Sequence, residues 1–390
     1  MIKVLSVQPD DIVIGGVQKR SIAVANQLNK NMFLTEFMVA KAKGDKPFSN
    51  LARNQGYKCH EYNGVYRPSR VHGYKSLLRN IKWLLMMPVS IISAYRIIKG
   101  TKCDIVHING FLNLIPLIAS KLASKKVIFH LIGDHYPKWA VQRLHFLLIL
   151  ADKRLFIANK LQTYYLESAN TRNTVVYEPI RYDLSSASSV NTKDITDEFN
   201  ISDYDYVIGN VANYTPAKDW LSFIEIANKL IKDYPDTNFL FLCVGSKVSN
   251  HNSYFEKLEQ AIINYEIQDS FVFTGYRNDV LEFISVMNVF LMPSTMEGTP
   301  ISILEAFMVS TPVIASDVGG ISEQIIDGKN GFICSSKNIR CFYEKLKYLL
   351  FKHELQVSLN EEAFIRLQKL FSLDTHVKKM ESIYINLINK

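Results

Sequence analysis

The sequence predicts an α/β protein with two domains of similar size, each built on a parallel β-sheet. Its 390 residues exceed what one hydrophobic core usually supports, which favours two domains. Short apolar runs rich in Val, Ile and Phe alternate with longer amphipathic stretches, as expected when helices connect parallel strands. Hydrophobic residues make up 48% and charged residues 21%, which indicates a folded globular protein rather than a disordered chain.

Short apolar segments in both halves of the chain are predicted to be strands. In the first half they are 3–7, 33–39, 104–109, 127–131, 155–159 and 174–177, and in the second half 206–211, 239–244, 271–274, 289–293, 312–315 and 331–334. The polar stretch between the two sets contains Pro179 and the run SSASS, which indicates a domain junction. We therefore expect an N-terminal domain at 1–180, a second domain at 181–372 and a C-terminal helix at 373–390 that packs back on the first domain.

The cysteines and the apolar tracts indicate a cellular location. Five cysteines lie mostly in apolar runs and form no CxxC pair, which favours buried free thiols in a reducing cytosol. We predict neither a signal peptide nor a transmembrane span. The longest apolar tract, 83–98, contains Pro88 and Arg96 and is shorter than the roughly 20 residues of a spanning helix. A cytoplasmic protein is therefore expected.

One segment carries the basic excess behind the net charge of +8. Residues 67–102 hold eight Lys or Arg and no Asp or Glu. Part of this segment is predicted to be an amphipathic helix, with an apolar arc made by Leu77, Leu78, Ile81, Leu84 and Leu85 opposite Lys75, Arg79 and Lys82. Two interpretations stay open: a core-packed helix with a solvated face, and a helix that contacts an anionic membrane surface. Nucleic-acid binding is disfavoured, because RNA-binding and zinc motifs are absent.

A candidate anion site lies in the second half of the chain. The segment VFLMPSTMEGTPISILEAF indicates a strand, a turn and the start of a helix. Thr299 is predicted to be the N-cap and Pro300 the first helical residue. A helix that begins at the carboxyl end of a parallel strand attracts anions, so the backbone amides of Ile301 and Ser302 are candidates to hold a diphosphate.

Two carboxylates flank this helix start. Glu297 lies in the turn, and Glu305 lies about 7.5 Å further along the helix than Pro300. That separation lets the two carboxylates accept hydrogen bonds from two different sets of hydroxyl groups. Solvated surface carboxylates are the alternative, which Gly298 and the Thr-Pro helix start disfavour.

These motifs resemble a known family. The E-x7-E element, followed by EAF, TPVIASDVGG and GKNGF, is similar to family 4 of the retaining glycosyltransferases, the glycosyl transferases group 1. Several motifs recur in order over nearly the whole chain. The resemblance implies the GT-B fold, in which two Rossmann-like domains with parallel sheets face each other across a cleft. It also implies that Glu297 contacts the donor sugar and Glu305 the ribose.

Further positions match the donor site of this family. Gly275, Tyr276 and Arg277 match a turn whose backbone reads the nucleobase, although Tyr276 could equally be a packing residue. In VANYTPAKD, Lys218 matches the lysine that neutralises the donor diphosphate, whereas the family's arginine is replaced by Asn213. A missing cation costs transition-state stabilisation. Arg277 or a basic residue of the facing domain is a candidate to supply it, and a slow or inactive protein is the alternative.

The N-terminal half supplies fewer candidates. The segment IGGVQK is neither the GxGxxG of a dinucleotide site nor a P-loop. Gly15 and Gly16 match the family's glycine-rich loop, where phosphate or sugar can approach the backbone. His130, at the end of KVIFHL, matches a histidine near the reacting carbon of the donor, and His107 is the weaker candidate. A lone histidine at a strand end is otherwise more often structural.

No metal site is expected. His130 with Asp134 and His135 has a spacing that defines no known metal site. The acidic pair in DYD at 203–205 lies in the polar interdomain stretch and is interpreted as solvated. The resemblance implies a transfer reaction that needs no bound metal.

We therefore expect retaining transfer of a hexose from a UDP- or GDP-sugar, the co-substrate, to a hydroxyl group of an acceptor, with no tightly bound cofactor. The expected acceptor is a carbohydrate, most often lipid-linked, in the assembly of bacterial O-antigen, capsule or exopolysaccharide. Lys218 and the helix-start amides are expected to stabilise the leaving diphosphate, while Glu297 and His130 orient the sugar. The expected location is cytoplasmic, peripherally at the inner face of the cytoplasmic membrane.

Two other functions stay open at this point. The first is a glycosidase that uses Glu297 and Glu305 as paired carboxylates. The second is an inactive subunit that binds sugar nucleotides, which the loss of the family's arginine at Asn213 suggests.

Overall fold

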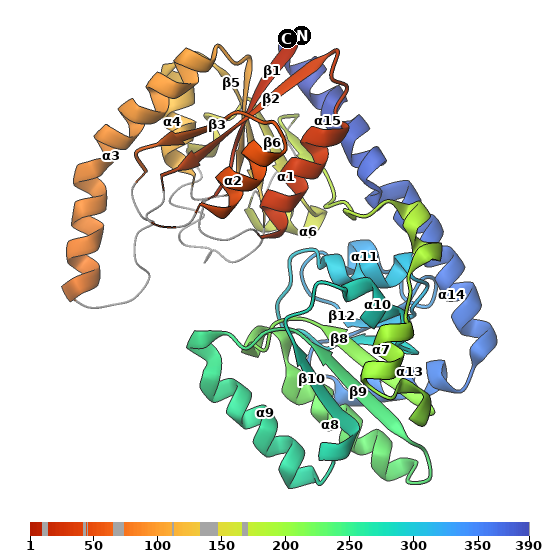
Figure 1. The fold of residues 1–390 in the computed structure, drawn as a ribbon. Helices are drawn as coiled ribbons and strands as arrows, with labels where there is room; N and C mark the ends of the chain where they lie inside the picture. Colours follow the sequence, from red (N-terminus) through yellow and green to blue (C-terminus); the bar gives the residue numbers. More distant parts are fainter. Residues whose placement is uncertain are drawn as a thin grey trace. The chain divides into compact units, whose positions relative to one another are not determined.

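The computed structural model describes residues 1–9, 15–41, 44, 46–64, 74–110, 113–132, 147–165 and 171–389. The chain forms two compact units (Figure 1). Unit 1 comprises Met1–Tyr177 and Leu373–Lys390, and unit 2 comprises Glu178–Ser372. Each unit contains one parallel sheet with helices around it, so the predicted α/β fold with two Rossmann-like domains is confirmed.

Unit 1 contains a seven-stranded sheet in the order β3-β2-β1-β4-β5-β6-β7. Its strands are β1 (Ile2–Val7), β2 (Phe33–Ala40), β3 (Cys59–Tyr62), β4 (Ile105–Asn109), β5 (Lys126–Leu131), β6 (Lys153–Phe156) and β7 (Asn173–Val175). The strand order reverses between β1 and β4, and ligands of such sheets bind at the carboxyl ends of the strands near this switch point. The edge strand β3 was not predicted, because its sequence CHEY contains no apolar run.

Helices cover both faces of this sheet. They are α1 (Gly16–Gln27), α2 (Pro47–Asn54), α3 (Tyr74–Thr101), α4 (Leu114–Leu122), α6 (Asn159–Tyr165) and the C-terminal α15 (Leu373–Ile388). Helix α15, blue in Figure 1, lies beside α1 and packs on Val4, Ile105 and Leu155 of the sheet. Helices α3 and α4 pack on the opposite face. Among the described helices, none combines the length and the apolar character that crossing a bilayer requires.

Unit 2 contains a six-stranded parallel sheet in the order β10-β9-β8-β11-β12-β13. Its strands are β8 (Tyr206–Val211), β9 (Phe239–Val244), β10 (Phe271–Gly275), β11 (Val289–Met292), β12 (Val313–Ser316) and β13 (Phe332–Cys334). Its helices are α7 (Lys193–Glu198), α8 (Trp220–Asp233), α9 (Asn252–Tyr265), α10 (Val280–Ser285), α11 (Ile301–Met308), α12 (Ile321–Gln324), α13 (Ile339–Leu350) and α14 (His353–Arg366). The switch point lies between β8 and β11. A ligand is therefore expected to bind at the carboxyl ends of these two strands.

The cysteines differ from the prediction. Cys334 at the end of β13 and Cys341 in the first turn of α13 form a disulfide, with their Cα atoms 5.8 Å apart. The expectation of five free thiols is therefore wrong for this pair, whereas Cys59, Cys103 and Cys243 are free. The turn after β13 folds the start of α13 back beside the strand, and the resulting Cα separation suits a disulfide. The sequence separation of seven residues does not reveal this approach.

Candidate functional site

An ion pair lies at the switch point of unit 2. Lys218 ends the short 3₁₀ helix η3 (Pro216–Lys218) that follows β8, and Glu297 follows β11. Because β8 and β11 are neighbouring strands, these residues meet, and the Lys218 Nζ atom lies 2.7 Å from Oε2 of Glu297. The Ser294 hydroxyl donates a hydrogen bond of 2.8 Å to the other carboxylate oxygen. The carboxylate is 5% exposed and held at both oxygens, so its orientation is fixed.

A cavity of about 360 Å³ opens beside this pair. It brings together most of the predicted site residues of unit 2, namely Asn213, Lys218, Tyr276, Arg277, Glu297, Pro300, Ile301 and Ser302. The volume suits a small organic ligand. The cavity is therefore the candidate binding site of this unit.

The start of α11 forms one wall of the cavity. Pro300, not Thr299, is the N-cap, and the helix begins at Ile301. The predicted cap is wrong by one residue, because Pro300 keeps an extended backbone (ψ 124°) instead of entering the helix. The Thr299 hydroxyl is buried without a hydrogen-bond partner among the described residues. The first amides of a helix have no partner within it, and Ile301 and Ser302 line the cavity. They can bind an anion there.

The turn after β10 contributes Tyr276 and Arg277 to the cavity lining. Gly275 has φ +75°, a left-handed conformation that glycine adopts without strain. Tyr276 follows with 68% of its surface exposed. An aromatic ring so exposed at the rim of a cavity is not a packing residue. It is available to stack on a planar ligand.

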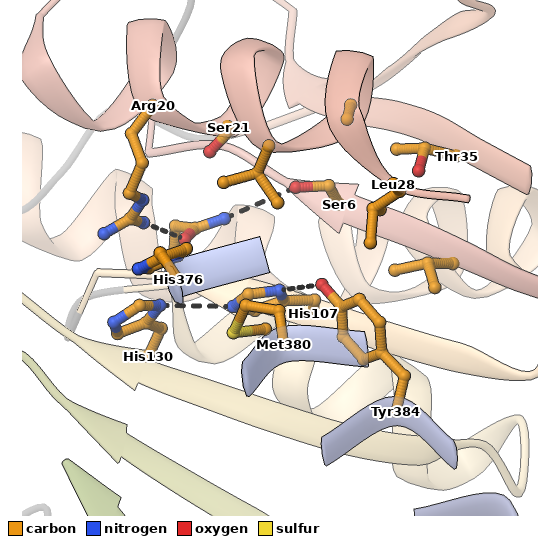
Figure 2. Close-up of a pocket in the computed structure, with 14 residues that line it drawn as sticks. Ser6, Arg20, Ser21, Leu28, Thr35, His107, His130, His376, Met380 and Tyr384 are labelled. Carbon is orange, nitrogen blue, oxygen red and sulfur yellow. Dashed lines mark hydrogen bonds between the residues drawn. The ribbon is translucent and has the colours of Figure 1, made fainter. Parts of the chain in front are cut away.

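Unit 1 presents two histidines near the carboxyl edge of its sheet (Figure 2). His107 of β4 and His130 of β5 stack with ring centroids 5.5 Å apart, and Nε2 of His107 lies 3.3 Å from Nδ1 of His130. Burial, followed by the charge of Arg20, lowers the pKa of His107 to about 3 and holds the pKa of His130 well below its ordinary value. Both imidazoles are therefore neutral at pH 7. Nε2 of His130 has no hydrogen-bond partner among the described residues.

The glycine pair lies at the start of α1 in the same unit. Gly15 is the N-cap, and its amide donates to Oε1 of Gln18 at 3.2 Å. A Cβ atom at Gly16 would meet no atom within 4 Å, so the helix start is open there. The backbone is therefore accessible at Gly16, and the binding role of the two glycines stays a prediction.

Known proteins of similar sequence identify the class of enzyme. The model of the family Glycosyl transferases group 1 matches residues 191–366, within unit 2. The protein is a glycosyltransferase. A relative from Escherichia coli, the UDP-Gal:alpha-D-GlcNAc-diphosphoundecaprenol alpha-1,3-galactosyltransferase, is 23% identical over 332 residues, which are 80% of this chain and 83% of that protein.

Solved structures show the same fold. This glycosyltransferase resembles one from Rickettsia africae with a TM-score of 0.79 at 19% identity, over 99% of this chain and 98% of the other. It also resembles the Anabaena protein HepE in complex with UDP-glucose, with a TM-score of 0.78 at 16% identity over 99% and 100% of the two chains. The GT-B fold implied by the sequence motifs is thereby confirmed.

Asn213, at the position of the family's arginine, makes structural hydrogen bonds in this glycosyltransferase. The side-chain Oδ1 atom of Asn213 accepts a hydrogen bond from the Ser246 amide at 3.4 Å, and the backbone carbonyl of Asn213 accepts one from the Trp220 indole at 3.2 Å. Asn213 thus ties the end of β8 to the loop after β9 and to α8. It carries no charge into the cavity.

Arg277, the suggested replacement cation, is already neutralised. Its guanidinium donates to both carboxylate oxygens of Asp279, at 3.0 and 2.7 Å, and to both oxygens of Glu198, each at 3.1 Å. These hydrogen bonds, with Asp279 first, raise the pKa of Arg277 above its ordinary value. Arg277 lines the cavity of the glycosyltransferase, but its charge is matched by two carboxylates.

Glu305 lies apart from the described cavity lining, buried on α11. The nearest guanidinium nitrogen of Arg181 is 4.0 Å from its Oε1 atom. Burial, followed by the charge of Glu305, raises the pKa of Tyr182. Sequence reasoning missed Arg181 and Tyr182, because the segment between the two sets of strands was interpreted as a junction. The adjacent Arg181 and Tyr182 in the segment VYEPIRYD could have indicated a functional position, because they place a cation beside an aromatic residue.

A glycine in the loop after β12 supports the turn of Glu297. Gly319 has φ +55°, and a Cβ atom there would lie 1.9 Å from the Glu297 carbonyl oxygen. The amide of the next residue, Gly320, donates to the Gly298 carbonyl at 2.6 Å. The backbone of the motif TPVIASDVGG therefore supports the turn that carries Glu297 in this glycosyltransferase. The sequence alone did not reveal this role.

Two predictions concern residues that the structure does not describe. Asp134 and His135 lie outside the described residues, as do Arg67 and Arg70 of the basic segment. Among the residues that are described, no group of three or more His, Cys, Asp or Glu could hold a metal ion.

Proposed function

We propose that this glycosyltransferase moves a hexose from a UDP- or GDP-sugar to a hydroxyl group of an acceptor, with retention of the anomeric configuration. The observation that carries the proposal is the Lys218–Glu297 pair at the start of α11, in a cavity with an exposed Tyr276. A cation, free helix-start amides and an exposed ring match the diphosphate and the base of a nucleotide sugar. The UDP-glucose in the similar Anabaena structure supports the assignment.

The diphosphate is assigned to Lys218 and to the amides of Ile301 and Ser302. During transfer, the bond between the anomeric carbon and the diphosphate oxygen breaks as the acceptor oxygen bonds to that carbon, and the proton of the acceptor hydroxyl passes to the departing diphosphate. Negative charge develops on the departing diphosphate. A lysine ammonium and fixed amides aimed at this charge stabilise the transition state more than the ground state. Lys218 is already held by Glu297, so it needs little reorganisation.

The other parts of the donor are assigned to the remaining residues. Tyr276 stacks on the base, with the backbone of Gly275 and Arg277 beside it. Glu297 accepts hydrogen bonds from the sugar hydroxyls, and Glu305 serves the ribose. In unit 1, His130 and the open backbone at Gly15 and Gly16 are assigned to substrate binding. No residue is assigned as a nucleophile.

The hydrolase alternative is less well supported. A glycosidase needs one carboxylic acid that donates a proton and one carboxylate that acts as base or nucleophile. Glu297 pairs with Lys218 at 2.7 Å, and Glu305 lies 4.0 Å from Arg181, so both face cations. Glu297 also lines the cavity, whereas Glu305 lies outside its described lining. The two carboxylates are therefore not placed as a pair that acts on one glycosidic bond.

Incubation with a panel of nucleotide sugars tests the function. We expect thermal stabilisation and turnover with a UDP- or GDP-hexose and an α-linked product, determined by NMR. Thermal stabilisation without turnover of any donor would favour an inactive binding subunit. Cleavage of aryl glycosides without any nucleotide would instead support the glycosidase.

The acceptor is proposed to be lipid-linked, as in bacterial surface polysaccharide assembly. The Escherichia coli relative is named for a diphosphoundecaprenol acceptor. Helix α3 supports membrane contact, because it exposes an apolar face formed by Ile81, Leu85, Met86, Val89 and Ile92. Its buried face contains Ser90, Ala94 and Ile98 instead. Exposed Arg96 and Lys99 continue the helix, which matches an anionic lipid surface.

The exposure of Ile81 and Leu85 supports the membrane interpretation of the basic segment. Ile81 is 44% and Leu85 is 74% exposed, so neither is a core residue of unit 1. The side chains of Leu77, Leu78 and Leu84 and of the three cations opposite them lie outside the described residues. The proposal therefore rests on the described side chains of α3, which include Ile81 and Leu85.

Binding to vesicles tests this contact. The double variant Leu85→Ser, Ile92→Ser should bind phosphatidylglycerol vesicles at least about tenfold more weakly than wild type, because two apolar side chains no longer insert. Binding should also weaken from low to high salt. Cosedimentation measures both. Ile263→Ser, at a 51% exposed position on α9, is the matched control and should bind like wild type. Equal binding of all three proteins would contradict the proposed surface.

A further inference from the structure

Three side chains form a buried row of hydrogen bonds in unit 1 (Figure 2). The Tyr384 hydroxyl of α15 lies 2.8 Å from Nδ1 of His107, whose Nε2 lies 3.3 Å from Nδ1 of His130. Tyr384 is 3% exposed, His107 7% and His130 1%. The row therefore connects the C-terminal helix to a predicted site residue, with no solvent between its members.

Each member of the row is neutral at pH 7. Burial lowers the pKa of both histidines and raises the pKa of Tyr384 above its ordinary value. A neutral imidazole has one nitrogen that donates and one that accepts. The hydrogen bonds can therefore run in only two directions, and the direction fixes the tautomer of both histidines.

The hydrogen-bond partners available to the Tyr384 hydroxyl decide between the two directions. If His107 donated to Tyr384, the hydroxyl hydrogen would need another acceptor. Tyr384 has no second hydrogen-bond partner among the described residues. That direction would leave two buried groups without a partner, the Tyr384 hydroxyl hydrogen and Nε2 of His130, whereas the reverse direction leaves only the Nε2–H group of His130. Each such group costs about 1 to 3 kcal/mol. The favoured direction therefore has Tyr384 donating to Nδ1 of His107 and His107 donating from Nε2 to Nδ1 of His130.

In this direction, Nε2 of His130 carries a hydrogen. That atom is buried and has no hydrogen-bond partner among the described residues. We propose that Tyr384 is a positioning residue, which acts through His107 to present the Nε2–H group of His130 as a hydrogen-bond donor to an oxygen of a substrate. The assignment of a substrate as the partner of His130 rests on the proposed function, whereas the tautomer of His130 does not.

The tautomer can be measured without any substrate. In ¹⁵N NMR spectra of the full chain, with signals assigned by single histidine variants, His130 of wild type should be the Nε2–H tautomer. Tyr384→Phe keeps the ring that packs on Phe33, with centroids 5.9 Å apart, and removes the hydroxyl. We expect His107 and His130 of this variant to exchange between tautomers. Tyr57→Phe, which loses a hydrogen bond to Asn26, is the control and should match wild type.

Kinetics then tests the link to transfer. With the donor identified by the panel, Tyr384→Phe should lower kcat by about fivefold, the effect of one hydrogen bond, and leave KM for the nucleotide sugar unchanged. The Nδ1–H tautomer of His130 in wild type would overturn the proposal, as would an unchanged single tautomer in Tyr384→Phe. The expected tautomers in a protein that turns over no nucleotide sugar would instead contradict the proposed function alone.

Discussion

Glu297→Gln is expected to lower kcat by about 100- to 1000-fold, the effect of removing one group aimed at the transition state. The amide keeps the shape of the side chain and can still accept from Ser294, which now holds one carboxylate oxygen at 2.8 Å. It loses the charge that orients Lys218. UDP should bind at least as tightly as to wild type, because Lys218 no longer shares its charge with a carboxylate. Initial rates with the preferred donor and calorimetry with UDP measure the two effects separately.

Glu305→Gln is the matched comparison. Glu305 is as buried as Glu297 but lies outside the described lining of the cavity, next to Arg181. If it serves the ribose, its loss should raise KM about tenfold and change kcat less, since a ribose contact is similar in the ground state and the transition state. The reverse pattern, with Glu305→Gln inactive and Glu297→Gln active, would refute the assigned roles.

Gly319→Ala is expected to remove both activity and stability. The added Cβ atom would meet the Glu297 carbonyl oxygen at 1.9 Å, so the turn that carries Glu297 must move. The left-handed backbone at φ +55° adds about 1 to 2 kcal/mol of strain for any residue other than glycine. We expect unit 2 to lose at least 3 kcal/mol of unfolding free energy in urea, on the order of other severe core overpacking.

Gly328→Ala separates the two causes. Gly328 also has a left-handed backbone, with φ +73°, but a Cβ atom there would meet no atom within 4 Å. This variant should lose only the strain of about 1 to 2 kcal/mol and keep its activity. If both variants are equally stable and active, the contact of Gly319 with the Glu297 turn has no functional role.

The sequence predicted the strands well because buried parallel strands are continuous apolar runs. Only β3 escaped, since the half-buried edge segment CHEY lacks such a run. The start of β6 was misplaced for a related reason. Lys153 and Arg154 begin that strand, although charged residues usually indicate a loop, and Arg154 is 5% exposed.

The motifs located the cavity of unit 2 but not its internal pairings. Lys218 and Glu297 were assigned separate roles, and their ion pair follows only from the adjacency of β8 and β11. Arg277 was a reasonable replacement for a missing cation, until the structure placed two carboxylates against it. Charge balance depends on neighbours in space. A single sequence does not specify those neighbours.

Contacts between distant segments were also beyond prediction. Tyr384 and His107 are 277 residues apart, and no local pattern connects a C-terminal tyrosine with a histidine of the fourth strand. The spacing of His376, Met380 and Tyr384 does place all three on one face of a helix. It indicates a buried face, but not what that face covers.

The place of α15 in the chain has a consequence for biosynthesis. Unit 2 is continuous in sequence, whereas unit 1 is completed by Leu373–Lys390, which are synthesised after unit 2. Until then, Val4, Ile105 and Leu155 lack the helix that covers them, and His107 lacks its tyrosine partner. Domains usually fold from the N-terminus during synthesis. In this protein, unit 2 can complete its folding before unit 1 does. Until Leu373–Lys390 are synthesised, unit 1 exposes an apolar sheet face that chaperones can bind.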